Sequence, residues 1–249
     1  MKTANERPPQ TSATRIALVT GASKGLGRAL ADALAAEGWT LVLDARGGEA
    51  LARAAAEIRG RHPGATVHAL PGDVTNATHR QALVETLAML GGVDLVVNNA
   101  GALGPSPLPP LVETPIDALE EVYRANVLAP LALVQAVRPL LRERAAIVQI
   151  TSDAGVEAYP GWGGYGSSKA ALEHLSRVLA VENPGLRVYT VDPGDMRTEM
   201  HQAAFPGEDI SDRELPEASV PGILALVNGD HPSGRYLAKQ VSAGVEVTP

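Results

Sequence analysis

The chain contains the stretch Arg15-Ile16-Ala17-Leu18-Val19-Thr20-Gly21-Ala22-Ser23-Lys24-Gly25-Leu26-Gly27. Its first six residues form an apolar run that predicts a buried strand, and residues 28–37 carry a helical pattern that stops at Gly38. A strand, a glycine-rich turn and a helix in this order suit a dinucleotide, because glycines let the backbone approach a pyrophosphate and the helix N-terminus meets its charge. The spacing differs from the G-x-G-x-x-G fingerprint, and a plain glycine-rich turn is the structural alternative.

Short apolar runs alternate with helical patterns along the rest of the chain. We expect further strands at residues 40–44, 66–70, 94–97, 146–150, 186–191 and 233–241, and helices at about 49–59, 76–90, 116–142 and 165–182. This alternation predicts an α/β fold with a doubly wound, Rossmann-like parallel sheet in three α/β/α layers. We expect a single domain over residues 15–241, a flexible N-terminal tail at 1–14 and a C-terminal tail at 242–249.

Composition narrows the possible functions. The net charge of -7 argues against binding to nucleic acid or an anionic membrane. The absence of cysteine excludes disulfides and thiol catalysis, and the six histidines are scattered, so we expect no metal site. No secretory signal is visible, and Pro130, Arg138 and Pro139 interrupt the apolar stretch at 127–141, so we expect no membrane span and a cytoplasmic protein.

Unusual residues follow several of the predicted strands. Asp73, the run Asn98-Asn99-Ala100-Gly101, Ser152 and the pair Pro193-Gly194 all stand where a strand ends. In open parallel sheets, ligands bind outside the carboxyl ends of the strands. We therefore expect these residues and the glycine-rich turn to share one site.

Tyr165 and Lys169 lie four residues apart at the start of a predicted helix. Residues at this spacing share one helix face. A phenol has an ordinary pKa near ~10, which a neighbouring cation lowers, and such a tyrosine becomes a usable general acid or base. Many Tyr–Lys pairs at this spacing are surface residues without a function. The pair therefore indicates catalysis only together with the residues around it.

Taken together, the motifs resemble those of the short-chain dehydrogenase/reductase superfamily in its compact single-domain form. The matching residues run in the family order from about residue 15 to residue 198. They are Thr20 to Gly27, Asp73, Asn98 to Gly101, Asn126, Ser152, Tyr165 with Lys169, and Pro193-Gly194 with Thr198.

The resemblance implies catalytic roles for four residues. Tyr165 would protonate a carbonyl oxygen as hydride arrives, or deprotonate an alcohol in the reverse direction. Lys169 would lower the pKa of Tyr165 and hydrogen-bond the nicotinamide ribose. Ser152 would hold the substrate oxygen, and Asn126 would anchor a water in a proton relay. The structural alternatives are a strand-end capping hydroxyl for Ser152 and a buried amide satisfied by backbone for Asn126.

The resemblance also implies a nicotinamide cofactor. Asp73 would hydrogen-bond the adenine, Thr198 would touch the carboxamide or pyrophosphate, and the backbone of residues 99–101 would line the site. The structural alternatives are a helix-capping carboxylate, a loop hydroxyl and a strand-ending turn. The full set expected to bind the cofactor is Gly21, Ser23, Lys24, Gly25, Leu26, Gly27, Arg46, Asp73, Val74, Asn99, Ala100, Gly101, Tyr165, Lys169, Pro193, Gly194 and Thr198.

The end of the second strand bears on the choice between NADP(H) and NAD(H). NAD-preferring relatives carry an acid there, on the ribose hydroxyls. Our alignment places Ala45 at that position, whereas Asp44 is one residue early and points to the other side of the strand. Lys24 and Arg46 could pair with a 2′-phosphate, from which we expect NADP(H) to be preferred over NAD(H). The structural alternative for both residues is a solvated surface cation. A one-residue slip would put Asp44 on the ribose and favour NAD(H).

Residues 195–217 are expected to form a variable loop over the substrate site. Met196, Met200 and Phe205 would line a pocket, with Leu103 and Trp162 facing them, which favours a hydrophobic ketone or alcohol. Relatives usually pair through the helices that contain Asn126 and Tyr165, so we expect a homodimer or homotetramer. Three alternatives stay open: a non-catalytic dinucleotide-binding or sensor protein, an NAD-preferring alcohol dehydrogenase, and a sugar-nucleotide epimerase or dehydratase, which the chain length disfavours.

Overall fold

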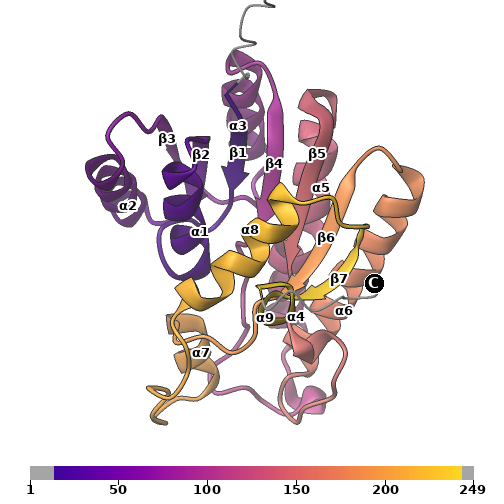
Figure 1. Cartoon of the computed structure of the whole chain (residues 1–249). Helices are drawn as coiled ribbons and strands as arrows, with labels where there is room; N and C mark the ends of the chain where they lie inside the picture. The colour runs from indigo at the N-terminus through magenta and orange to yellow at the C-terminus, as the bar shows by residue number, and fades with distance from the viewer. Residues whose placement is uncertain (1–13, 243–249) are drawn as a thin grey trace, which may run out of the picture.

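The protein folds around one seven-stranded parallel sheet with the strand order β3-β2-β1-β4-β5-β6-β7 (Figure 1). A computed structural model describes residues 14–242, so the predicted tails lie outside the described residues except for Thr14 and Ser242. The predicted doubly wound α/β fold is confirmed. The strands are β1 (Ile16–Val19), β2 (Thr40–Ala45), β3 (Val67–Pro71), β4 (Val93–Asn98), β5 (Leu141–Ile150), β6 (Arg187–Asp192) and β7 (Gly234–Leu237).

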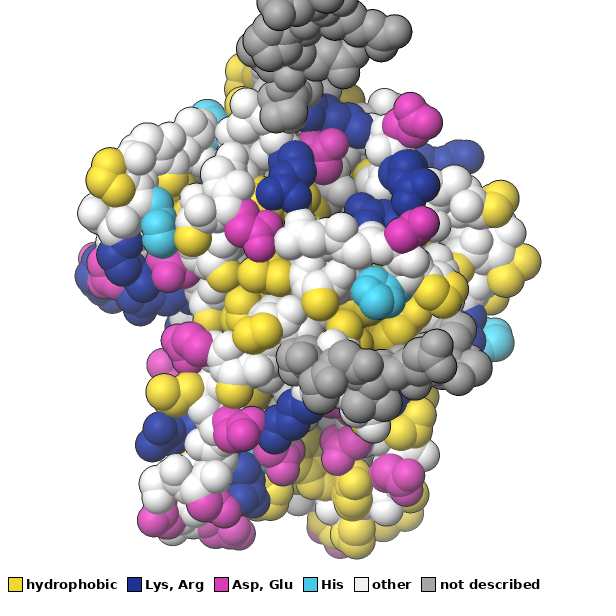
Figure 2. Space-filling model, viewed as in Figure 1, with side chains coloured by type: hydrophobic (Ala, Val, Ile, Leu, Met, Phe, Trp, Pro, Cys, Tyr) yellow, Lys and Arg dark blue, Asp and Glu magenta, His cyan; other side chains and the backbone are white. Residues whose placement is uncertain are grey.

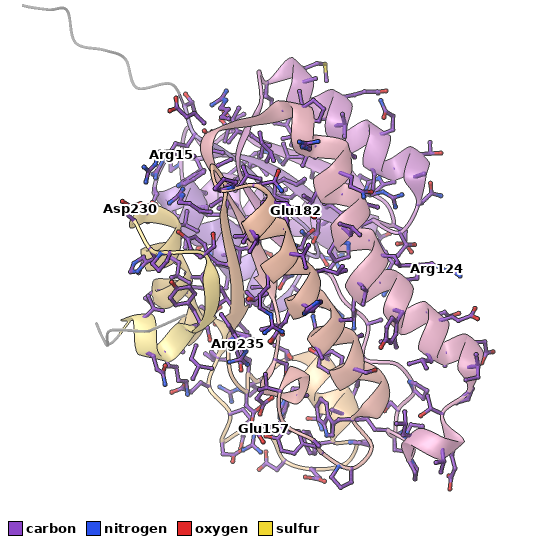
Figure 3. All side chains as sticks on the ribbon, turned by 90° about the vertical axis from the view of Figure 1, so that its right-hand side faces the viewer. Arg15, Arg124, Glu157, Glu182, Asp230 and Arg235 are labelled. Atoms are coloured by element: carbon purple, nitrogen blue, oxygen red, sulfur yellow. The ribbon has the colours of Figure 1, made fainter. Side chains whose placement is uncertain are left out.

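Helices cover both faces of the sheet and make a three-layer structure. The first layer holds α1 (Gly25–Ala36), α2 (Gly48–Arg61) and α8 (Val220–Asn228). The second layer holds α3 (Ala77–Met89), α5 (Ala129–Val137) and α6 (Gly163–Glu182), and Figure 3 shows α5 and α6 on the opposite side of the sheet from α8. The described residues include no helix that is both long and apolar enough to span a membrane.

The pattern of β1 explains why the sheet is buried on both faces. Ala17 and Val19 pack into the core beneath α1 and α8, whereas Ile16 and Leu18 pack into the core beneath α3 and α5. All four side chains are buried. A strand that is covered on both sides needs a continuous apolar run, since neither face meets water.

The helix predicted over residues 116–142 is wrong as a single element. It is divided into α4 (Ile116–Tyr123), a π-helical turn over Arg124–Leu128, α5 and a 3-10 turn over Arg138–Leu140, after which β5 begins at Leu141. Pro130 lacks the N–H that would bond the carbonyl four residues earlier, which favours the wider π turn, and Pro139 ends the regular helix. β5 therefore starts five residues before the predicted strand at 146–150.

The C-terminal strand predicted over residues 233–241 is also shorter in the structure. β7 pairs with β6 from Gly234 to Leu237, where β6 itself ends at Asp192. Beyond that point no neighbouring backbone extends the ladder, and the chain forms the short helix α9 (Ala238–Ser242). The predicted loop at 195–217 contains α7 (Glu199–Ala204), and a single β-bridge between Met196 and Glu214 closes its base.

A close helix contact fixes where β5 ends relative to α6. After β5 the chain makes a 3-10 turn, η4 (Asp153–Gly155), which packs directly on α6. A Cβ added at Gly155 would lie 3.2 Å from the backbone nitrogen of Ala170, and a Cβ at Gly166 would overlap the carbonyl oxygen of Ala154. Glycine at both positions is therefore what lets the two backbones meet.

We expect Gly166→Ala to lower the free energy of unfolding by about 1–3 kcal/mol, because the added methyl group overpacks the contact with η4. Gly60→Ala is the matched control, since nothing lies within 4 Å of a Cβ at this position in α2. The control should be neutral or stabilising by up to about 1 kcal/mol. Urea unfolding of both variants measures the difference, and equal effects would contradict the close-contact argument.

Candidate active site

A crevice of about 1640 Å³ runs along the carboxyl ends of the strands. It extends from the glycine-rich turn between β1 and α1 to the aromatic side chains of Trp162 and Phe205. Figure 1 shows α7 beside this end of the sheet. Every catalytic and cofactor-binding residue predicted from the sequence lines the crevice except Gly27 and Asn126, which lie behind it.

The backbone of the glycine-rich turn is fixed by left-handed glycines and by hydrogen bonds from a neighbouring side chain. Gly21 and Gly25 have φ values of 66° and 55°, the left-handed region that favours glycine. The Asn99 side chain donates to the carbonyl oxygens of Thr20 at 2.9 Å and Gly21 at 3.2 Å. A Cβ at Gly27 would lie 2.5 Å from the Asn99 amide nitrogen, so glycine at this position leaves room for the Asn99 side chain and its two hydrogen bonds.

The turn also delivers the N-terminus of α1 to the crevice. Lys24, the N-cap residue, makes no side-chain capping bond, so its side chain leaves the first backbone N–H groups of the helix uncovered. Unsatisfied N–H groups at a helix start favour a phosphate. Gly101 lines the crevice further along, and a Cβ there would lie 3.8 Å from the Lys169 Nζ. Together these glycines form a cradle that fits an extended dinucleotide.

Tyr165 and Lys169 both face the crevice from α6, as the sequence predicts. The Lys169 Nζ lies 5.4 Å from the centre of the Tyr165 ring and donates to the Ile150 carbonyl at 2.8 Å. Ser152 begins η4, and its hydroxyl donates to the Asp153 carboxylate at 2.9 Å. The Gly155–Gly166 contact thus brings Ser152 to the helix that carries the Tyr–Lys pair.

Burial sets the acidity of this pair. Desolvation lowers the pKa of Lys169 to about 8, although the nearby Glu173 carboxylate opposes the shift. Burial also raises the pKa of Tyr165, and the carboxylates of Asp192 and Asp153 add to that rise. The net effect of lost hydration and two acidic neighbours is thus a raised pKa for Tyr165. The expectation that the Lys169 ammonium favours the phenolate stays a prediction.

Asn126 occupies the π-helical turn and is 1% exposed. Its side-chain nitrogen donates to the Ala102 carbonyl and to the Ser168 hydroxyl, both at 2.9 Å, and its oxygen accepts from the Ala102 backbone nitrogen at 2.8 Å. Both side-chain donors are thus occupied by protein groups. Asn126 therefore ties the crevice wall to α6, and its role as the anchor of a water stays a prediction.

The opposite end of the crevice carries the residues expected at the adenosine. The Asp73 carboxylate accepts the Thr75 backbone N–H at 2.8 Å. Burial opposes ionisation of Asp73, but hydrogen bonds from Thr75 and the positive charge of Arg46 outweigh it and lower its pKa. Arg46 is exposed at the rim, and Lys24 forms an exposed ion pair with Glu199 of α7. A phosphate bound to Lys24 would compete with that pair.

The loop after β6 closes over the same cradle. Gly194 has a φ of 77°, and its backbone nitrogen donates to the Asp192 carboxylate at 2.9 Å. Thr198 caps α7 through the His201 backbone nitrogen at 3.2 Å. A Cβ at Gly25 would lie 3.6 Å from the Thr198 methyl group, so the start of α7 stands directly over the glycine-rich turn.

The far end of the crevice is apolar, as predicted. The Trp162 ring centre lies 5.7 Å from that of Tyr165 and 5.9 Å from that of Phe205. Leu103, Met196 and Met200 line the same space. The sequence reasoning missed the polar residues at its mouth, where the Tyr159 hydroxyl donates to Asp153 at 3.0 Å.

A partly buried charge network beneath the proposed catalytic residues was also missed. Arg235 of β7 donates to Glu173 at 3.0 Å and to Asp192 at 2.9 Å, and Figure 3 shows it beside α6. Its guanidinium also reaches the Ser152 carbonyl at 3.4 Å, and Glu173 accepts the Thr151 hydroxyl at 2.7 Å. The partners are 43 to 62 residues away in sequence, so no local spacing reveals the network.

The described residues hold no group of three or more His, Asp or Glu side chains arranged to bind a metal ion. On the face shown in Figure 2, acidic and basic side chains are interspersed rather than gathered into one basic patch. The crevice is therefore the feature of the described chain that combines size, perturbed acidity and convergent polar groups.

Comparison with known proteins agrees with the geometry. The family model for short chain dehydrogenases matches residues 15–209. The chain is 36% identical over 225 residues to the uncharacterized oxidoreductase YciK of Escherichia coli strain K12, which covers 87% of both chains. The chain belongs to the short-chain dehydrogenase/reductase family, which consists of oxidoreductases that act on CH–OH groups. The resemblance inferred from the motifs is thus confirmed.

Two similar crystal structures contain a cofactor. A short chain dehydrogenase from Shigella flexneri complexed with NADP has a TM-score of 0.84 at 33% identity and covers 90% of this chain and 97% of its own. A short chain dehydrogenase from Escherichia coli CFT073 complexed with NADPH has the same TM-score of 0.84 and identity of 33%, covering 90% of this chain and 96% of its own.

Arg235→Met should reduce turnover and leave cofactor affinity nearly unchanged. The variant leaves two buried carboxylates without a cation, which costs about 3–5 kcal/mol of stability. With Asp192 no longer offset, the pKa of Tyr165 rises further, so alcohol oxidation, which needs the phenolate, moves to higher pH. Arg235→Lys keeps the charge and should restore part of the pH profile. A lower melting temperature with an unchanged pH profile would show a purely structural role.

Proposed function

We propose that the protein is an NADP(H)-dependent oxidoreductase that transfers a hydride between nicotinamide and a carbonyl compound or secondary alcohol. The observation that carries this proposal is the placement of Tyr165, Lys169 and Ser152 together at the apolar end of a crevice that begins at a glycine cradle. Nucleotide site and acid–base pair thus share one continuous space, as hydride transfer to a substrate requires.

The residues of the crevice fit the cofactor. The cradle at Gly21, Gly25 and the start of α1 would hold the pyrophosphate, and Asp73 would hydrogen-bond the adenine. Arg46 at the rim and Lys24 would bind a 2′-phosphate by charge-assisted hydrogen bonds. NADP(H) supplies or accepts the hydride when bound. Two similar structures hold NADP or NADPH, which supports this cofactor for the present chain.

Tyr165 would move the proton at the substrate oxygen. Its raised pKa keeps the phenol protonated at neutral pH, so it is ready to donate to a carbonyl oxygen during reduction. Ser152 would donate its hydroxyl hydrogen to the same oxygen by exchanging its present bond to Asp153. The Lys169 ammonium lies close enough to stabilise negative charge that develops on the phenol oxygen.

The apolar end of the crevice supports a hydrophobic substrate. Trp162, Phe205 and Met196 would enclose the carbon groups beside the reacting carbonyl, because burial of apolar surface there is favourable. Closure by α7 would exclude water from the reacting atoms.

We also propose the setting in which the protein works. A single catalytic domain over residues 15–241 would act in the cytoplasm as a homodimer or homotetramer. The exposed apolar side chains of Ile116, Leu128 and Val181, which are 68%, 57% and 82% exposed, support association through the layer that holds α4 and α6. Such side chains gain free energy when a second copy covers them.

Tyr165→Phe should lower kcat for ketone reduction by about 10²–10⁴-fold, since the proton donor is lost while the ring and its packing remain. Cofactor affinity should change little. Tyr159→Phe is the matched control, because this phenol lies at the mouth of the crevice and its hydroxyl bonds the Asp153 carboxylate. Turnover of a ketone found by screening measures both, and a near wild-type kcat for Tyr165→Phe would refute the assignment.

Arg46→Ala should weaken binding of NADPH about tenfold more than binding of NADH, because it removes one charge-assisted contact to the 2′-phosphate. The wild-type protein should bind NADPH more tightly than NADH. Cofactor fluorescence titrations measure all affinities without a known substrate. Arg53→Ala, an exposed cation in α2, should change neither affinity. Equal losses of affinity for NADPH and NADH in Arg46→Ala would show that Arg46 does not contact the 2′-phosphate.

A further inference from the structure

A hydrogen bond between a carboxylate and an imidazole is buried directly behind the adenosine end of the crevice. Asp44 is in β2, one residue before its end, and its carboxylate lies 2.5 Å from the Nε2 of His79. The two side chains are 2% and 10% exposed. His79 lies in the first turn of α3, 35 residues away in sequence.

The imidazole is held tightly in place. A Cβ at Gly72 would overlap the His79 ring, so the ring packs directly on the backbone of the loop after β3. The Gly72 backbone nitrogen donates to the Ala45 carbonyl at 3.0 Å, which fixes that loop beside the end of β2. His79 therefore has little room to release the carboxylate.

The buried position of Asp44 is unfavourable for a charged carboxylate. Burial raises the pKa of Asp44, and the Asp73 carboxylate adds to that rise, while the His79 side chain and a hydrogen bond from the Gly21 backbone oppose it. Both Asp44 and Asp73 belong to the wall of the crevice, as does Arg46. Without His79, rotation toward the solvent of the crevice would be the way for Asp44 to stay ionised.

A carboxylate at the rim of this strand end has a defined effect on nicotinamide cofactors. It accepts hydrogen bonds from the two hydroxyls of an unphosphorylated adenosine ribose. It also repels a 2′-phosphate, which carries like charge at close range. The direction in which the Asp44 side chain is held thus bears on which cofactor fits.

We propose that His79 is a positioning residue for cofactor choice: it anchors the Asp44 carboxylate inside the fold and thereby keeps the ribose pocket open to a 2′-phosphate. This inference rests on the proposed preference for NADP(H). It assigns that preference to a buried pair in addition to the cations at the rim.

The test is a set of fluorescence titrations with NADPH and with NADH. His79→Ala removes the anchor and should lower the ratio of NADPH affinity to NADH affinity about tenfold, the effect of losing or adding one charge contact. His79→Ala combined with Asp44→Asn removes the released charge as well and should return the ratio to within about threefold of wild type. His79→Gln, which retains an N–H donor, should keep the wild-type ratio.

The outcomes separate this inference from the proposed function. If the wild-type protein binds NADH as tightly as NADPH, the cofactor proposal and this inference both fail. If wild type prefers NADPH and His79→Ala weakens both cofactors by the same factor or leaves the ratio unchanged, the inference alone fails. If His79→Ala fails to fold, His79→Asn repeats the test, because this polar side chain is too short to keep the bond to Asp44. A wild-type ratio of NADPH to NADH affinity in His79→Asn overturns the inference.

Discussion

The contact between two glycine-bearing segments, η4 and the start of α6, is the constraint on which the proposed active site depends. Side chains at Gly155 or Gly166 would separate the end of β5 from the helix that carries Tyr165 and Lys169. Lys169 also links α6 to the end of β5, because its Nζ donates a hydrogen bond to the Ile150 carbonyl. Because a phenol, an ammonium and a hydroxyl can act on one substrate atom only when their spacing is fixed, backbone packing here is a condition for chemistry.

The strands and the motifs at their ends were predictable because both follow local rules. A strand covered on both faces needs a continuous apolar run, and residues after parallel strands meet at one edge. The failures lie where local rules compete with the tertiary structure. Prolines at 130 and 139 divide a helix whose apolar pattern is otherwise continuous. The last strand ends where its neighbour does, at Asp192, which no property of residues 238–241 indicates.

The sequence indicated which residues line the candidate site better than it indicated their pKa values. Sequence order placed nearly all proposed residues on one crevice, yet it did not indicate that burial raises the pKa of Tyr165. That rise depends on burial and on the carboxylates of Asp192, at the end of β6, and Asp153, in η4. Arg235 and His79 were missed for the same reason, since each finds its carboxylate partner only through the strand order of the sheet.

The chain holds two tryptophans, and they stand in very different places. Trp39 is buried just before β2, where the Arg15 guanidinium lies 4.2 Å from its ring centre. Trp162 lines the crevice in edge-to-face contact with the Tyr165 ring. The protein therefore carries an intrinsic optical reporter beside its reacting atoms: with Trp39 replaced by phenylalanine, indole emission would come from a single ring in contact with the proposed proton donor.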